Sequence, residues 1–195
     1  MITIRNERVS DADAREALLD AAYGDVRFAK PSHKLRDGRV PAAGLSLVAT
    51  EDGRIVGSVR LWHVRAGETH DALLLGPLAV DPTCRNRGIG AALMQRALRF
   101  ARMRDHGAVL LVGDACYYGR FGFSAELTDG MSMAGQPDQA RLLAFELKPG
   151  ALTGARGEIE AAGVPDLEPA KVVAPRRSRA ALRAAVALQP VSHAA

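Results

Sequence analysis

The chain has 195 residues, of which 48% are hydrophobic and 25% are charged, and its formal net charge is +4. These values are typical of a soluble globular domain with a core of its own. No apolar run is long enough to span a membrane, and residues 1–8 carry charges where a signal peptide needs an apolar stretch. We therefore expect a cytoplasmic protein with no membrane segment.

Cysteine content and charge distribution exclude further classes. Cys84 and Cys116 are too few for a disulfide framework and lack the spacing of metal ligands, so we expect no bound metal. Five of the 26 basic residues lie in residues 171–195, which contain no Asp or Glu, and the rest of the chain has 21 basic against 22 acidic residues. Because this body is nearly neutral, we do not expect nucleic acid as a partner.

The first 43 residues contain one predicted strand and one predicted helix. Residues 2–5 alternate apolar and polar side chains, which indicates a short strand. A helix-start signal, Ser10-Asp11-Ala12-Asp13, precedes a predicted helix over residues 14–22. Residues 23–43 are irregular and form either a solvated loop or the border of an acceptor site. The basic residues in this segment are Lys30, His33, Lys34, Arg36 and Arg39.

The middle of the chain predicts a sheet with one crossover helix. Residues 45–49 and 54–62 are predicted strands joined by a hairpin turn at Asp52-Gly53. Residues 73–80 form an apolar run typical of a buried strand, which Asp81-Pro82 ends. Apolar side chains then recur at helical spacing from Ile89 to Ala101, and residues 108–112 form another buried strand. A strand, a crossover helix and a second strand should be parallel and right-handed.

The C-terminal part carries weaker signals. Residues 142–147 are predicted to form the last strand. Residues 151–170 are rich in Gly, Ala, Pro and Glu, and we expect them to be loosely structured. Residues 180–188 could form a helix with a small Ala-rich face, in a tail that we expect to be flexible or weakly docked.

A glycine-rich loop lies between the central strand and the long helix, at Arg85-Asn86-Arg87-Gly88-Ile89-Gly90. A helix N-terminus presents unpaired N–H groups and about half a positive charge. Gly88 and Gly90 have no side chains that would block a ligand, and Arg85 and Arg87 add positive charge. The pattern therefore predicts a phosphate or pyrophosphate site, and the alternative is a tight turn whose glycines only allow close packing.

This loop resembles the acetyl-CoA loop of the GNAT superfamily of N-acetyltransferases, whose signature is Arg/Gln-x-x-Gly-x-Gly/Ala after a strand. A second motif, Tyr118-x-Arg120-x-Gly122-Phe123, resembles the Tyr-x-Lys/Arg-x-Gly-Phe that members carry after the following strand. Residues 75–82, 111–114 and 117–123 are similar to the YhbS-like branch of this superfamily. The resemblance covers roughly residues 1–160 and not the tail.

The resemblance implies a mixed α/β fold of three layers. Its central sheet would have six to seven mostly antiparallel strands, splayed at the central parallel pair, with helices on both faces. Residues 1–150 would form the GNAT N-acetyltransferase domain. Residues 151–195 would be an Ala/Pro-rich, basic and partly flexible C-terminal extension.

The resemblance also implies acetyl-CoA as cosubstrate and a primary amine as acceptor. The pantetheine arm would bind the backbone of Leu78, Ala79 and Val80 as an added strand does. The pyrophosphate would bind the N–H groups of the loop and first helical turn. The implied cofactor-binding residues of this second region are Arg85, Asn86, Arg87, Gly88, Ile89, Gly90 and Ala91. The amine would attack the thioester directly through a tetrahedral intermediate.

The leaving thiolate needs a proton, and the motif places Tyr118 to supply it. Tyr117 stays open as an alternative, and either tyrosine could instead be a core residue with one polar contact. Many members carry a glutamate on the central strand as general base, but residues 73–80 contain no acidic residue. The base is therefore open among four nearby groups, His63, His70, Asp71 and Asp114.

The sequence leaves other functions open. A non-catalytic CoA-responsive binding module is the main alternative, with the basic tail contacting an acidic partner or nucleic acid. The same fold could also use an acyl-carrier protein or another acyl chain. A homodimer is a further open partner, and the sequence does not name the acceptor amine.

Overall fold

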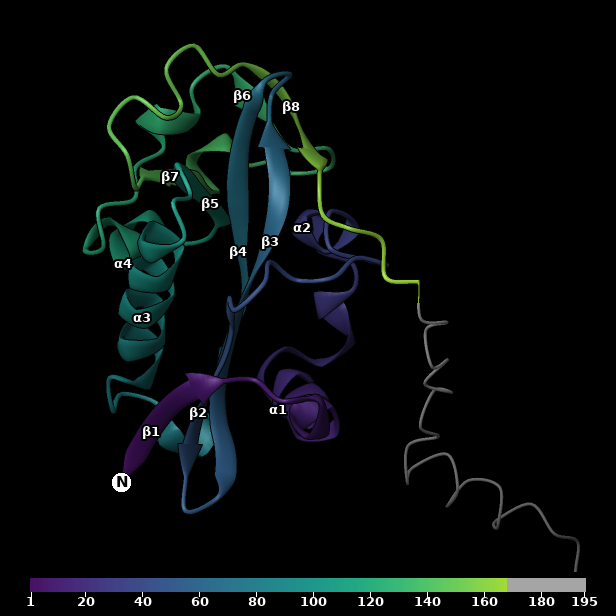
Figure 1. Cartoon of the computed structure of the whole chain (residues 1–195), viewed down its shortest axis with the longest axis vertical. Coiled ribbons are helices and arrows are strands. Elements are labelled where there is room, and N and C mark those ends of the chain that lie inside the picture. Colours follow the sequence, from purple (N-terminus) through teal and green to yellow (C-terminus); the bar gives the residue numbers. More distant parts are fainter. Residues whose placement is uncertain (168–195) are drawn as a thin grey trace, which may run out of the picture.

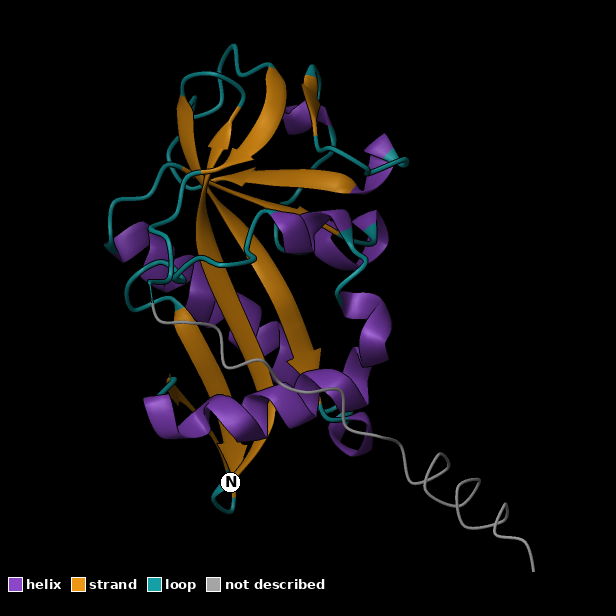
Figure 2. Ribbon diagram, turned by 90° about the vertical axis from the view of Figure 1, so that its right-hand side faces the viewer, coloured by secondary structure: helices purple, strands orange, loops and turns teal. Residues whose placement is uncertain are grey.

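The computed structural model describes residues 1–167, in which eight strands and four α-helices form an open α/β fold (Figures 1 and 2). The strands are β1 (Ile2–Asn6), β2 (Ser46–Glu51), β3 (Arg54–Ala66), β4 (His70–Val80), β5 (Ala108–Val112), β6 (Met131–Ser132), β7 (Leu142–Glu146) and β8 (Gly157–Ala161). The helices are α1 (Ala12–Tyr23), α2 (Pro31–Lys34), α3 (Ile89–Met103) and α4 (Ala115–Gly119).

The predicted mixed sheet is confirmed. Six strands follow the order β1-β2-β3-β4-β5-β7, and their neighbours are antiparallel except for the parallel pair β4 and β5. The helix between that pair is α3, as the crossover pattern predicts. At the C-terminal end of β3, β8 adds an antiparallel neighbour, and β6 runs parallel to β8.

Helices cover both faces of the sheet. In Figure 1, α3 lies on one side of β3 and β4, and α1 and α2 lie on the other. Leu73 and Leu75 of β4 pack in the same cluster as α3. Ala79 of β4 packs instead against Leu18 and Leu19 of α1. Simple alternation would place Ala79 on the same face as Leu75, so the bulge at Gly76 and Pro77 between them explains the change of face. Apolar side chains of one central strand therefore hold all three layers together.

The central parallel pair splays apart, as expected. The pairing of β4 with β5 is limited to Leu73 with Val109 and Leu74 with Leu110. The partner strand β3 stays paired with β4 to Val80, across a bulge in which Gly76 and Pro77 lie opposite one residue of β3. One edge of β4 from Leu75 onward is consequently left without a neighbouring strand.

Two expectations for the C-terminal part need correction. Eight strands replace the six to seven expected, because β6 and β8 are present. The expectation that residues 151–170 are loosely structured is wrong for β8. Leu152, Ala155 and Ile159 are buried in a core cluster with Met131, which explains why this Gly- and Ala-rich segment is ordered. The predicted helix at residues 180–188 and the basic tail lie outside the described residues.

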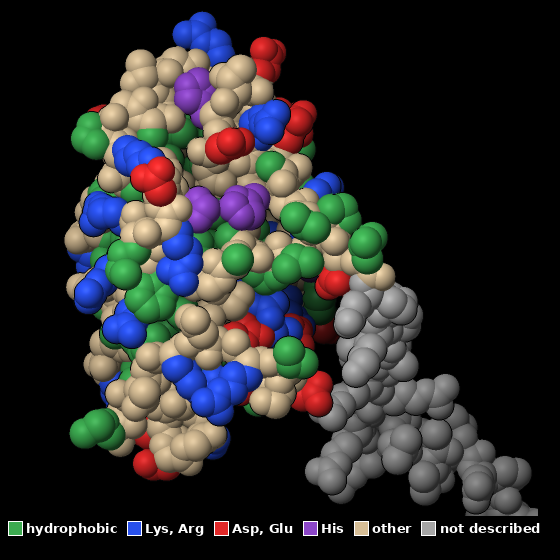
Figure 3. Space-filling view, viewed as in Figure 1, with side chains coloured by type: hydrophobic (Ala, Val, Ile, Leu, Met, Phe, Trp, Pro, Cys, Tyr) green, Lys and Arg blue, Asp and Glu red, His purple; other side chains and the backbone are tan. Residues whose placement is uncertain are grey.

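The surface carries charges of both signs. Figure 3 shows Lys and Arg side chains together with Asp and Glu side chains on one face. Among residues 1–167, no helix combines the length and the apolar character that a membrane crossing requires.

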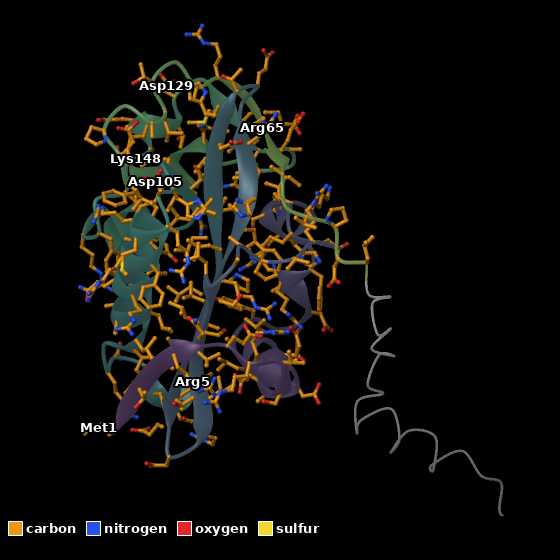
Figure 4. All side chains as sticks on the ribbon, viewed as in Figure 1. Met1, Arg5, Arg65, Asp105, Asp129 and Lys148 are labelled. Atoms are coloured by element: carbon orange, nitrogen blue, oxygen red, sulfur yellow. The ribbon has the colours of Figure 1, made fainter. Side chains whose placement is uncertain are left out.

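Ion pairs fix the start of α1 against the sheet. Arg5 of β1 donates to the Asp11 carboxylate at 2.6 and 3.0 Å, and the Arg8 N–H donates to it at 2.7 Å. Figure 4 shows where Arg5 leaves β1. These hydrogen bonds, above all the one from Arg5, lower the pKa of Asp11 to about 2. The Glu7 side chain, only 6% exposed, pairs with Arg15 of α1 and Arg60 of β3.

We predict that Asp11→Asn destabilises the protein by about 1–3 kcal/mol at pH 7, because a charge-assisted hydrogen-bond acceptor is lost. The folded pKa of Asp11 lies below the unfolded value of about 3.9, so the ionised carboxylate stabilises the fold above that pH. This contribution disappears as the pH falls toward 2. Urea unfolding at pH 7, 5 and 3 should show the variant approaching wild type.

The control is Asp129→Asn, because Asp129 is exposed and makes no ion pair among residues 1–167 (Figure 4). Its free energy of unfolding should change by less than about 0.5 kcal/mol. An Asp11→Asn protein as stable as wild type at pH 7, or a deficit that is the same at pH 3, would contradict the prediction.

Candidate functional site

The glycine loop opens α3 with exposed backbone. Residues 85–88 are exposed, and Asn86 and Gly88 both have left-handed backbones, with φ of 61° and 76°. Gly88 is the N-cap of α3, and no side-chain hydrogen bond caps this helix. A Cβ at Gly88 would meet no atom within 4 Å. The first N–H groups of a 15-residue helix therefore face open space, which suits an anionic group.

The two arginines of the loop have different surroundings. Arg87 donates to both carboxylate oxygens of Glu51 at 2.6 and 2.9 Å, and this pairing raises its pKa. The positive charge that the sequence assigned to Arg87 is thus neutralised at the end of β2. Arg85 has no carboxylate partner in residues 1–167, and its charge is close enough to act on the pKa of Tyr23. Arg85 is therefore the loop cation that is available to a ligand.

The three β4 residues predicted to hold the pantetheine arm are paired with β3 but have no strand on the other side. Leu78 and Val80 are half-buried, and Ala79 is buried beneath α1. The Leu78 carbonyl accepts a hydrogen bond from the Tyr23 hydroxyl at the end of α1. A ligand amide that bonds to this carbonyl would share it with Tyr23.

Tyr118 is held by the local structure of α4. The Asp114 carboxylate caps this helix by accepting from the N–H groups of Cys116 and Tyr117 at 2.8 and 3.4 Å. The Tyr118 ring packs edge-on against Tyr117, with 4.9 Å between the ring centroids. It also covers Gly113, where a Cβ would overlap the ring. Glycine at this position lets the aromatic ring lie directly on the backbone at the end of β5.

The Tyr118 side chain is half-buried, and its hydroxyl is free of protein partners among the described residues. No hydrogen bond reaches this oxygen from any other residue in the range 1–167. Burial, together with the neighbouring phenols of Tyr23 and Tyr117, raises the pKa of Tyr118. The group is thus a neutral proton donor across the physiological pH range.

Tyr117 points elsewhere. Its hydroxyl lies near Gly90 of α3, 3.1 Å from the position that a Cβ there would take. Its ring lies under the Arg120 guanidinium, at 4.1 Å. Tyr118 lines the cavity described next, and Tyr117 does not. The structure therefore separates two neighbouring tyrosines that the sequence alone left as alternatives.

A cavity of about 250 Å³ lies between α1, α2 and the central strands. Its floor includes Leu75, Leu78 and Leu111, so it meets the opening between β4 and β5. The basic segment that follows α1 borders the cavity, as one of the two interpretations of that segment holds. The charged residues that line it are Arg15, Glu16, Arg27, Lys30, His33, Arg36, Asp37 and Arg60.

The four groups considered as general bases lie outside this cavity. Asp71 is exposed and pairs with Arg65, and Asp114 caps α4. The His63 ring lies 5.5 Å from that of His106, and a ring nitrogen of His70 lies 3.1 Å from the Thr153 carbonyl. These contacts give each group a structural partner away from the cavity.

Two residues that line the cavity, Tyr23 and His33, were not assigned a role from the sequence. Tyr23 closes a helix and carries no local motif, so nothing in the sequence marked it. His33 was grouped with other basic residues, but burial and the charge of Arg36 lower its pKa, which leaves a neutral imidazole at pH 7. Among residues 1–167, no group of three or more His, Cys, Asp or Glu side chains could hold a metal ion.

Comparisons with known proteins agree on one family. A family model described as the acetyltransferase (GNAT) domain matches residues 42–125. The uncharacterized N-acetyltransferase YhbS of Escherichia coli strain K12 is 31% identical over 159 residues, which cover 80% of this chain and 94% of YhbS. These matches include the glycine loop and the Tyr118 motif.

Two solved structures are similar to most of this chain. The crystal structure of YhbS from Escherichia coli in complex with CoA has a TM-score of 0.71 and 31% identity, and covers 82% of this chain and 89% of that one. A GNAT family acetyltransferase from Brucella melitensis in complex with acetyl-CoA has a TM-score of 0.59 and 28% identity. That match covers 76% of this chain and 90% of the Brucella protein.

We predict that Gly113→Ala destabilises the protein by about 1–3 kcal/mol, because the added methyl overlaps the Tyr118 ring and forces it to move. Gly119→Ala is the control in the same segment, since a Cβ at Gly119 would meet no atom within 4 Å. It should be neutral or slightly stabilising. Urea unfolding measures both variants, and equal stabilities would contradict the proposed contact between Gly113 and Tyr118.

Proposed function

Because the chain belongs to the GNAT family of acetyltransferases, we propose that it moves the acetyl group of acetyl-CoA to a primary amine by direct attack. The observation that carries this proposal is the half-buried Tyr118, which lines a cavity at the open edge of β4 and whose hydroxyl has no partner among residues 1–167. An acceptor in the cavity and an acyl donor on that edge would meet beside this phenol.

The chain offers acetyl-CoA two kinds of backbone site. Residues 78–80 present a strand edge, to which the amide-rich pantetheine arm can add as a strand does. The uncapped start of α3 presents N–H groups from Asn86 to Ala91 for the pyrophosphate, and Arg85 supplies a free positive charge. The CoA and acetyl-CoA complexes of the two similar crystal structures support this assignment.

The reaction follows from these positions. The amine nitrogen attacks the thioester carbonyl carbon through a tetrahedral intermediate, and a backbone N–H near Leu78 stabilises the developing oxyanion. The carbon–sulfur bond then breaks, and Tyr118 donates its proton to the departing sulfur. The proton lost by the amine passes to water or to a cavity base, and an amine that enters deprotonated needs neither.

The elevated pKa of Tyr118 suits this role. A phenol that stays protonated at neutral pH is available as a donor in every turnover. Holding the amine and the thioester in line supplies much of the remaining acceleration. A cytoplasmic location, a domain boundary near residue 150 and a homodimer stay predictions.

A non-catalytic CoA-binding module is not favoured. Such a module would need the loop and the β4 edge, but it would have no use for a cavity-lining phenol whose hydroxyl is free of protein partners among residues 1–167. YhbS, the relative that aligns over most of the chain, is described as an N-acetyltransferase.

We predict that Gly88→Glu weakens acetyl-CoA binding at least tenfold, because its carboxylate would stand where the loop is proposed to hold a pyrophosphate. Gly88→Ala is the matched control, since it imposes the same strain at a φ of 76° without adding charge. Its dissociation constant should change much less. Calorimetric titration with acetyl-CoA measures both, and equal affinities of the Glu and Ala variants would refute the loop assignment.

We predict that Tyr118→Phe lowers kcat by about 10² to 10⁴-fold, because the departing sulfur loses its proton donor. The dissociation constant of acetyl-CoA should change less than about threefold, since the phenol contacts only the sulfur end. Tyr117→Phe is the matched control, and its kcat should stay within a few-fold of wild type. The measurement is CoA release over a panel of amines, and equal losses in the two variants would remove Tyr118 from this role.

A further inference from the structure

Arg36 is a buried cation at the wall of the cavity. It follows α2, its residue is only 8% exposed, and its Nε donates to the Ser32 carbonyl at 2.9 Å. This bond fixes the side chain and leaves the two terminal nitrogens for other partners. One of them, Nη1, lies 3.8 Å from the position that a Cβ on Gly76 would occupy. The guanidinium therefore reaches the bulge of β4, at the floor of the cavity.

No carboxylate neutralises this guanidinium within residues 1–167. The three other arginines that line the cavity are all paired: Arg15 with Glu7 and Glu16, Arg27 with Glu16 and Asp20, and Arg60 with Glu7. A charge of low exposure without a partner is costly, so a ligand carboxylate that supplied the counter-charge would be stabilised here.

The electrostatics agree with the geometry. Burial, and secondarily the charge of Arg27, lower the pKa of Arg36 to about 10, which still leaves the group charged at neutral pH. Lys30 lies near it, as the effect of Arg36 on the pKa of Lys30 shows, and Lys30 also has no carboxylate partner in the described part of the chain. The cavity thus contains an excess of positive charge.

One side chain, Tyr23, connects Arg36 with the proposed reaction centre at Tyr118. Tyr23 donates to the Leu78 carbonyl, and its hydroxyl interacts electrostatically with both Arg36 and Tyr118. A cavity of about 250 Å³ is smaller than the roughly 300–1,000 Å³ typical of sites for drug-sized ligands. It suits a small molecule whose amine reaches Tyr118 while its other end reaches Arg36.

We propose that Arg36 binds the carboxylate of the acceptor, so that the substrate of this enzyme is a small amine carrying a carboxylate group. The two free terminal nitrogens of the guanidinium match the two oxygens of a carboxylate, which favours a bidentate pair over a contact with a neutral group. This inference rests on the proposed acetyl transfer and adds the chemical class of the acceptor.

The test compares amines in matched pairs. Glycine, γ-aminobutyrate and L-lysine are each assayed beside their carboxamides, because the three place the amine and the carboxylate at different separations. At saturating acetyl-CoA, wild type should show a kcat/KM at least tenfold higher for one or more carboxylates than for the matching carboxamide. Arg36→Gln should abolish that preference, mainly by raising KM about 10 to 100-fold, and leave the carboxamide within about threefold.

Two further variants separate charge, geometry and folding. Arg36→Lys keeps the charge but not the two-pronged donor, so it should retain part of the preference. Lys34→Gln removes one charge from the neighbouring exposed position of α2, outside the cavity, and should behave as wild type. Calorimetric binding of the preferred carboxylate to the CoA-saturated protein gives a readout that does not depend on turnover. That binding should be lost in Arg36→Gln, while CoA affinity is kept.

The outcomes distinguish this inference from the function beneath it. Acetylation of carboxamides as efficiently as of carboxylates, or an unchanged preference in a folded Arg36→Gln protein, would overturn the role of Arg36 and leave acetyl transfer intact. Wild-type protein that does not bind acetyl-CoA would overturn the proposed function, and the inference with it.

Discussion

The structure depends on a strand that loses one neighbour in the middle of a sheet. From Leu75 onward, β4 keeps β3 on one side and has no strand on the other, because β5 diverges after Leu110. A free edge exposes backbone donors and acceptors that would otherwise pair. Side chains provide hydrogen bonds to some of these backbone groups. Trp62 donates to the Gly76 carbonyl at 2.7 Å, and Tyr23 donates to the Leu78 carbonyl. The remaining edge is a natural place for an extended, amide-bearing ligand.

The sequence predicts those parts of the site that are encoded locally. The glycine loop, the start of α3 and the Tyr118 motif each lie within a few consecutive residues, so residue type and spacing are sufficient. Tyr23, His33 and Arg36 could not be assigned in this way, because their roles arise when α1 and α2 are folded over β4. Tyr23 contacts Leu78, 55 positions away, and Arg36 lies near Gly76 of β4, and no short pattern records such contacts.

The same distinction explains the errors at element level. The crossover from β4 through α3 to β5 was predicted because apolar periodicity and handedness determine it. Strand β8 was missed because five residues with one buried side chain, Ile159, carry almost no periodic signal. Its pairing with β3 comes from tertiary context, as is common for short edge strands. The ion pair between Arg87 and Glu51 also joins distant segments, and this is why the loop has one free arginine and not two.

Charge pairing around the cavity leaves one arginine, Arg36, without a carboxylate partner among the described residues. Glu7 and Glu16 each pair with two arginines, which gives three of the four guanidinium groups around the cavity a carboxylate partner. Arg36 would need one more carboxylate as a partner, and the described residues of the chain do not supply it. Tyr23 connects this incomplete set to the free edge of β4, because one hydroxyl interacts with Leu78, Arg36 and Tyr118. The cavity and the free edge of β4 therefore meet at Tyr23. The position of Tyr23 depends on how α1 is anchored to β1 and β3, so the ion pairs of Glu7 and Asp11 influence the geometry of the cavity from outside it.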